Sequence, residues 1–149
     1  MEEPSYSIIK DALSPDEVSS LLELYKSVFN DYQKDSFVNR LNTSKNLFAL
    51  LVSVEDELIA FKIGYEMSPE IFYSWVGGVK PEWRRKGIAK KLQMLQEEYV
   101  AKAGYKTLRT KSTNKFKPMM QFNLKNGFDI VGVENSKNGL KVLFEKKIK

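Results

Sequence analysis

The most informative segment of the chain is Val79-Lys80-Pro81-Glu82-Trp83-Arg84-Arg85-Lys86-Gly87-Ile88-Ala89-Lys90-Lys91-Leu92. An apolar run over residues 71–79 precedes it, and apolar residues at positions 88, 92, 95, 99 and 103 follow at helical spacing. The pattern predicts a strand, a short basic loop and a helix that begins near Gly87. The first amide groups of a helix lack partners within the helix, and the helix dipole makes that end attractive to anions.

The composition of the loop predicts that a phosphate group binds at this helix N-terminus. Gly87 has no side chain, so an anion can approach the backbone closely, and Ala89 is small for the same reason. Four cationic side chains surround these two residues: Arg84, Arg85, Lys86 and Lys90. The segment lacks both the lysine–serine pair of phosphate-binding loops and the glycine-rich dinucleotide fingerprint. The alternative is a basic loop that only precedes a helix.

The rest of the sequence predicts a mixed α/β chain. Ser14-Pro15-Asp16-Glu17 is a helix start, because serine and glutamate three residues apart form a capping box and proline suits the first helical position. Hydrophobic periodicity predicts helices over residues 15–29, 35–41, 88–103 and 118–126. Strands are expected over residues 6–9, 47–54, 58–66, 71–79, 106–111, 128–133 and 140–144.

The basic segment resembles motif A of the GNAT family of N-acetyltransferases, whose pattern is R/Q-x-x-G-x-G/A. Arg84, Gly87 and Ala89 stand at its three defining positions, and the order of elements is similar over nearly the whole chain. The resemblance implies the GNAT fold, a mostly antiparallel, splayed mixed sheet flanked by helices, in one domain over residues 1–149. It also implies acetyl-CoA as cosubstrate and a primary amine, of a small molecule or a protein, as acceptor.

The resemblance implies a cofactor site around the basic loop. The amides from Arg85 to Lys90 would hold the pyrophosphate, and Gly78 and Val79 would bind the pantetheine and polarise the acetyl carbonyl. The cofactor-binding residues are then Gly78, Val79, Arg84, Arg85, Lys86, Gly87, Ile88, Ala89, Lys90 and Asn114.

A second segment is similar to motif B of the family, but with one departure. It comprises Asn114 and, further on, residues 123–128, which end in Gly127-Phe128. Many family members carry a tyrosine four residues before this glycine, which protonates the leaving thiolate; here that position is Asn123. An asparagine would hydrogen-bond the thiolate or a pantetheine amide, or it would only support the helix. The departure keeps a second hypothesis open, a GNAT-fold module that binds CoA without turnover.

The chain contains neither cysteine nor histidine, which restricts its chemistry. Thiol nucleophiles, histidine acid–base catalysis and Cys/His metal sites are excluded, and no metal site is expected. A carboxylate is then the expected base, and Glu66, at the end of the 58–66 strand, is the first candidate. The alternative for Glu66 is an exposed turn residue. Tyr73 and Trp75 share one face of the 71–79 strand, where they would line the acceptor pocket or belong to the core.

Charge divides the chain into two unequal parts. The chain has 24 basic and 19 acidic residues. Residues 1–83 contain 7 basic and 14 acidic residues, a net charge of −7, whereas residues 84–149 contain 17 basic and 5 acidic residues, a net charge of +12. An acidic part beside a cofactor-binding basic part favours a cationic acceptor. No nucleic-acid partner is expected, because the basic residues follow no recognisable binding motif. No apolar run reaches the roughly 18–20 residues of a membrane span, and the N-terminus lacks a signal core. We therefore expect a cytoplasmic protein; a homodimer stays open.

Overall fold

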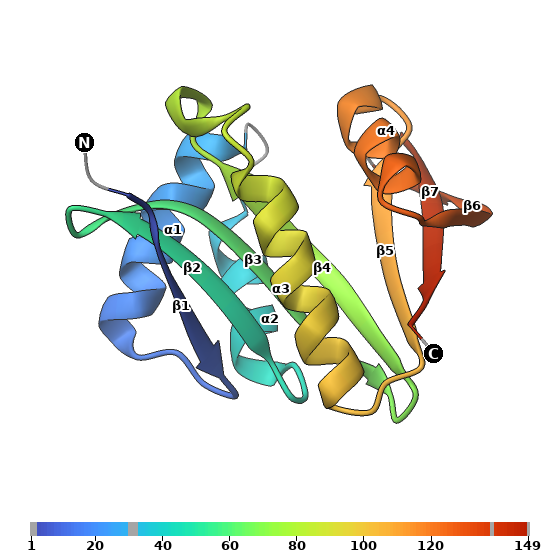
Figure 1. Cartoon of the computed structure of the whole chain (residues 1–149), viewed down its shortest axis with the longest axis horizontal. Coiled ribbons are helices and arrows are strands. Elements are labelled where there is room, and N and C mark those ends of the chain that lie inside the picture. The colour runs from blue at the N-terminus through green and yellow to red at the C-terminus, as the bar shows by residue number, and fades with distance from the viewer. Residues whose placement is uncertain (1–2, 30–32, 138, 149) are drawn as a thin grey trace.

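A seven-stranded mixed sheet forms the centre of the molecule (Figure 1). The computed structural model describes residues 3–29, 33–137 and 139–148. The strand order is β1-β2-β3-β4-β5-β7-β6, and every neighbouring pair is antiparallel except β4 and β5, which run parallel. The strands are β1 (Ser5–Lys10), β2 (Phe48–Val54), β3 (Glu57–Ser68), β4 (Ile71–Val79), β5 (Thr107–Thr113), β6 (Asp129–Ser136) and β7 (Gly139–Lys147).

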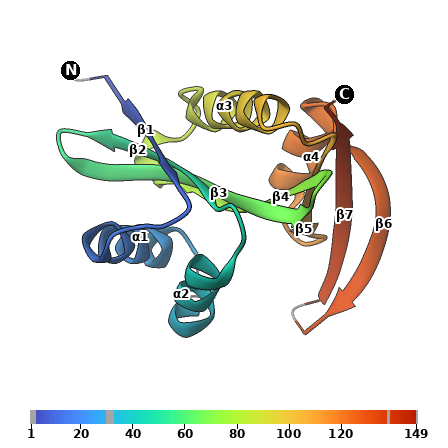
Figure 2. The same ribbon diagram turned by 90° about the horizontal axis from the view of Figure 1, so that it is seen from below.

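Helices cover both faces of the sheet. Helices α1 and α2 lie on one face, and α3 and α4 lie on the other (Figure 2). The helices are α1 (Pro15–Val28), α2 (Lys34–Thr43), α3 (Ile88–Lys102) and α4 (Lys117–Lys125), with a short 3₁₀ turn η1 (Pro81–Trp83) after β4. In the described part of the chain, no helix has the length and apolar character that a membrane crossing requires.

Helix α1 begins where the capping box predicts. The Ser14 hydroxyl accepts a hydrogen bond from the amide of Glu17 (3.2 Å), and the Glu17 carboxylate accepts one from the amide of Ser14 (2.7 Å). Each bond satisfies an amide that the helix itself leaves without a partner. The apolar stripe of the helix then buries Leu21 and Leu24 against the sheet.

The sheet separates two hydrophobic cores. The core between α3 and the sheet includes Leu92 of α3 and four residues of the sheet: Phe48, Phe72, Leu108 and Phe144. Under α1 and α2 pack Leu21, Leu24, Phe37, Leu41, Phe61 and Ile63. Because β2, β3 and β4 are buried on both faces, their sequences are nearly continuous apolar runs. The predicted α/β fold, with a mostly antiparallel sheet flanked by helices, is confirmed.

The sheet opens between β4 and β5. Only four residue pairs join these strands, from Ile71 with Thr107 to Ser74 with Thr110. Beyond this point residues 76–79 of β4 pair only with β3, and residues 111–113 of β5 pair only with β7. We call residues 75–79 the open segment. It begins at a β-bulge, because Ile63 and Gly64 of β3 pair with Val76 and Ser74, which leaves Trp75 as an extra residue.

Close packing at the bulge depends on Gly64. A Cβ atom there would lie 2.4 Å from Cε2 of Phe72 and 2.6 Å from the carbonyl oxygen of Tyr73. We predict that Gly64→Ala lowers the free energy of unfolding by about 1–3 kcal/mol, because such overpacking shifts backbone and core side chains. Gly132→Ala is the control, since its Cβ would meet nothing closer than 3.4 Å. Urea unfolding measures both; equal stability of the two variants would contradict the prediction.

Candidate functional site

The loop between β4 and α3 has a backbone conformation suited to binding an anion. After η1, Arg85 adopts a φ of 62° and Gly87 a φ of 83°, both in the left-handed region. Alternating backbone conformations of this kind direct successive amide groups into one concavity. Apart from Gly87 and the adjoining backbone, no atom of the described residues lies within 4 Å of where a Cβ of Gly87 would be, so the space above the loop is open.

The N-terminus of α3 keeps its amide groups available. The first bond of the helix runs from the amide of Lys91 to the carbonyl of Gly87 (3.0 Å), and no side chain caps the helix. The amides of Ile88, Ala89 and Lys90 therefore precede the first helical hydrogen bond. The Ile88 side chain is 4% exposed and anchors the helix in the core, so this residue offers only its backbone to a ligand.

Two of the predicted cationic side chains hold the site together. Arg84 Nε donates to the carbonyl oxygen of Val79 (2.9 Å), which ties the loop to the end of β4. Lys90 Nζ donates to Asn126 Oδ1 (2.9 Å), which ties α3 to the end of α4. Arg85 and Lys86 are exposed beside the loop. The amides and these charges together fit a diphosphate.

The open segment presents backbone groups to its free edge. The Lys80 amide donates to the Ile59 carbonyl in β3 (2.9 Å). Successive residues of a strand direct their amides to opposite edges, so Gly78 points to β3, whereas Gly77 and Val79 point to the free edge. Gly78 is required for packing instead, because a Cβ there would lie 2.7 Å from Cγ1 of Val28 in α1.

Polar side chains are buried on the α3 side of the opening. Gln96 is fully buried on α3, and within the part of the chain that the structure describes neither atom of its side-chain amide has a hydrogen-bond partner. The buried Ser112 hydroxyl, in the part of β5 that has left β4, has none either. Leaving such groups unsatisfied costs about 1–3 kcal/mol each. Donors and acceptors without partners beside an open strand edge fit a ligand with amide groups, such as pantetheine.

The two predicted asparagines flank the opening from α4 and its preceding loop. Asn123 is the buried residue of α4, with 5% of its surface exposed. Asn114 lies just beyond β5, where its amide donates to the Leu140 carbonyl (2.9 Å) and its Oδ1 accepts from Lys117 Nζ (3.2 Å). The loop before α3 and helix α4 lie at the same end of the molecule, on either side of the opening (Figure 1).

Glu66 does not join these residues. It pairs with Phe72, at the end of the sheet where β4 and β5 are still joined. Its carboxylate accepts hydrogen bonds from Tyr105 (2.8 Å) and Asn46 (3.0 Å), and it forms an ion pair with Lys45 (3.1 Å). These bonds, that from Tyr105 above all, lower the pKa of Glu66. A carboxylate with a lowered pKa and several partners is a weak base, and this position favours a structural role.

Tyr73 and Trp75 lie on one face of β4, as their spacing predicts. That face carries α2, where Trp75 packs on Phe37 with ring centroids 5.2 Å apart. Each ring already has a cation beside it: Arg40 lies 5.1 Å from the Trp75 centroid, and Lys111 lies 6.0 Å from the Tyr73 centroid. Burial raises the pKa of Tyr73 to about 12. Both residues therefore belong mainly to the core beside the opening.

Three residues on the α3 side of the opening were not predicted from the sequence: Lys62, Gln96 and Ser112. Lys62 is the one charged residue within the apolar stretch 58–65, and this is the signal that pointed to it. Gln96 interrupts the apolar stripe of α3 in a comparable way. Ser112 carries no signal in the sequence, because only the strand pairing shows where it lies.

Comparisons with known proteins agree with this geometry. A family model described as "Acetyltransferase (GNAT) family" matches residues 11–128. None of the curated protein sequences matches the chain.

Solved structures share the fold. One is the ribosomal-protein-S18-alanine N-acetyltransferase from Escherichia coli (TM-score 0.79, 14% identity, covering 97% of this chain and 95% of that one). A GNAT acetyltransferase from Elizabethkingia anophelis, solved with acetyl-CoA bound, has a TM-score of 0.76 at 17% identity, with 95% and 97% covered. The PaiA N-acetyltransferase from Thermoplasma acidophilum, in complex with coenzyme A, has a TM-score of 0.70 at 22% identity, with 95% and 99% covered.

We predict that Gly87→Glu abolishes CoA binding. The added side chain places a carboxylate beside the amides that would hold the pyrophosphate, and a misplaced like charge costs several kcal/mol, or more than about 100-fold in affinity. The control is Gly104→Glu, because Gly104 has a φ of 92° and equally open surroundings but follows the other end of α3. Isothermal titration with CoA compares the two variants. Equal affinity in both would show that the site lies elsewhere.

Glu66→Gln is predicted to lower thermal stability without changing catalysis. A lowered pKa in the folded state means that the carboxylate stabilises the fold above its usual pKa of 4.5, and that this contribution disappears as the pH falls through the folded value. The difference in Tm between wild type and variant should therefore narrow on acidification. Glu70→Gln, which removes an exposed ion pair with Lys106, is the control and should have little effect. Loss of kcat with loss of a limb in the pH profile would instead identify Glu66 as the base.

Proposed function

This chain belongs to the GNAT acetyltransferase family, and we propose that it moves the acetyl group of acetyl-CoA to a primary amine by direct attack while both substrates are bound. Members of this family use acetyl-CoA as their cosubstrate, as in the relative solved with it bound. The observation that carries the proposal is the opening of the sheet, at residues 75–79, beside the uncapped N-terminus of α3.

The proposal assigns the cofactor to the basic loop and the open segment. The backbone amides of residues 85–90, with Arg85 and Lys86, bind the pyrophosphate. The side chains of Gln96 and Ser112 form hydrogen bonds with the amide groups of the pantetheine. Acetyl-CoA supplies an activated carbonyl, held as a thioester at the free edge of β4.

The Val79 amide is the proposed donor to the carbonyl oxygen of the thioester. Its position at the free edge follows from the alternation that directs the Lys80 amide to β3. A fixed donor stabilises the negative charge that develops on this oxygen during attack. Arg84 supports it, because its bond to the Val79 carbonyl fixes the peptide orientation at the end of the strand.

The amine would approach the opening from the side of the sheet that carries α1 and α2. On that side, β6 and β7 curve towards α2 (Figure 2). We propose a cationic acceptor, since residues 1–83 carry a net charge of −7. Five of these acids line a separate groove of about 570 Å³ between α1 and the β2–β3 hairpin: Asp16, Glu17, Glu23, Asp56 and Glu57. Because this groove is separate from the opening, the acids would attract the amine through their long-range electrostatic field and not by direct ion pairs.

A second candidate is a module that binds CoA without turnover. The observation in its favour is Asn123, which is buried on α4 where many family members have a tyrosine acid. An amide does not release a proton to a thiolate. This candidate requires that no other group in the opening performs that task.

We predict that the protein releases CoA from acetyl-CoA in the presence of cationic amines. A thiol-detecting assay should be run with cationic, neutral and anionic amines at low and high salt. Because salt screens the attraction between exposed charges, the KM for a cationic amine should rise with ionic strength. Gly87→Glu serves as the inactive control. Preference for an anionic amine, or a KM independent of salt, would contradict a cationic acceptor, whereas CoA binding without release from any amine would favour the non-catalytic module.

A further inference from the structure

Lys62 is a charged residue in the middle of β3, where the residues on either side of it, 59–61 and 63–64, are buried. Its neighbours Phe61 and Ile63 face the core under α1 and α2, so the side chain of Lys62 faces α3. It is partly buried. Burial lowers its pKa from 10.5 to about 8, and the charge of Glu97 opposes part of this shift. A lysine in this position requires an explanation, because a buried ammonium is costly unless it has a partner.

The position of Lys62 places its amine at the opening of the sheet. Lys62 pairs with Gly77, which belongs to the open segment. Neighbouring strands lie about 4.8 Å apart, which is less than the length of a lysine side chain with its four methylene groups. Gly77 has no side chain to block the path, and a Cβ there would lie 3.4 Å from Cγ of Lys62. The Lys62 side chain therefore lies against β4 at Gly77, and its four methylene groups are long enough to reach the free edge, to which the Gly77 and Val79 amides point.

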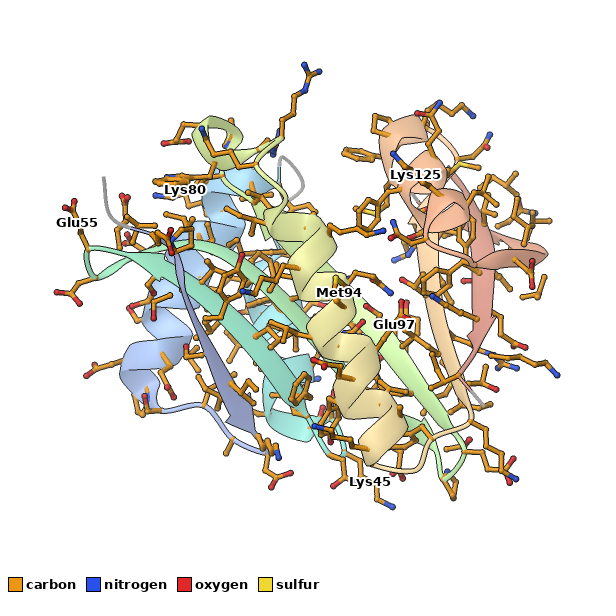
Figure 3. The ribbon with its side chains drawn as sticks, in the orientation of Figure 1. Lys45, Glu55, Lys80, Met94, Glu97 and Lys125 are labelled. Carbon is orange, nitrogen blue, oxygen red and sulfur yellow. The ribbon has the colours of Figure 1, made fainter. Side chains whose placement is uncertain are left out.

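The charged groups around Lys62 leave a positive excess. Glu97 of α3 accepts hydrogen bonds from Lys146 of β7 (2.9 Å) and from Gln93 (2.7 Å). Figure 3 shows Glu97 and Met94 on the flank of α3 that faces α4 and β5. On the same face, β4 and β5 present uncharged residues: Ser74, Thr110 and Ser112. Two ammonium groups therefore share one carboxylate, and this arrangement favours an anion in the opening.

We propose that Lys62 is a catalytic acid that protonates the thiolate of CoA as it leaves. The assignment rests on the proposed acetyl transfer. It supplies the proton donor that Asn123 does not, from the neighbouring strand of the sheet instead of from α4.

The step balances in atoms and charge. The neutral amine forms a bond to the carbonyl carbon of the thioester, its nitrogen becomes cationic and gives one proton to water, and the carbon–sulfur bond breaks with its electron pair on sulfur. Lys62 gives one proton from Nζ to that sulfur and becomes a neutral amine, which water then reprotonates. A thiol has a pKa of about 8.5, so an acid that titrates near 8 transfers its proton with little driving force in either direction, the condition in which general acid catalysis is efficient.

Two substitutions separate proton donation from charge alone. Lys62→Met removes both and should lower kcat about 10²–10⁴-fold, the usual contribution of a general acid, with little change in the KM for acetyl-CoA. Lys62→Arg keeps the positive charge but does not release a proton near neutral pH, so it should be impaired as well. In the wild type, kcat should fall above about pH 8, where Lys62 loses its proton, and both variants should lose that limb. Lys106→Met, at an exposed position, is the control and should retain full activity. Full kcat in Lys62→Met or in Lys62→Arg would overturn the assignment.

A binding measurement tests the same contact without turnover. The ultraviolet absorbance of the thiolate follows the titration of CoA bound to the protein. In the wild type the thiol should ionise at lower pH than in free CoA, because an ammonium beside the sulfur stabilises the anion. In Lys62→Met the bound thiol should lose this shift, and in Lys106→Met it should keep it. An equal thiol pKa in the wild type and Lys62→Met would overturn the role of Lys62 alone, whereas failure of the wild type to bind CoA would overturn the proposed function and this assignment with it.

Discussion

The short parallel pairing of β4 with β5 is the constraint on which the rest of the structure depends. Four residue pairs join the two strands, and the bulge at Trp75 marks the point where they part. The parting exposes one edge of β4 without exposing the core, because β3 still pairs with the other edge and α3 covers the face. Backbone donors, buried amide groups and a lysine thus meet in one place, although they come from separate elements.

The sequence predicted the elements well, and for identifiable reasons. The strand over residues 71–79 and the start of the helix at Ile88 lie where their apolar patterns place them. These are local signals, since a two-residue period, a capping box or a glycine before a helix act over a few residues. The basic loop was found in the same way, because the features that predict phosphate binding there, a glycine, basic side chains and a helix start, belong to consecutive residues.

The features that were not predicted depend on pairings between distant segments. The end of the β4–β5 ladder and the bulge are matters of register, which apolar runs do not encode when both faces are buried. Glu66 was chosen as a base from its place at a strand end, but Asn46 and Tyr105, which are 20 and 39 residues away, hold its carboxylate in the structure. In the sequence Lys62 was visible only as a charge among apolar residues. Its proposed role became apparent only from its pairing with Gly77 on β4.

The ties between α3 and the C-terminal part have a consequence for the ligand-free molecule. Little backbone bonding joins β1–β4 to β5–β7, and the pairs Lys90–Asn126 and Glu97–Lys146 supplement it across the gap. A cofactor that contacts both sides adds a further brace, and its binding free energy then counts towards the cohesion of the whole chain by mass action. With CoA in the position proposed above, its free concentration would help to set how often the two sides of the opening separate, and so how long each molecule survives proteolysis.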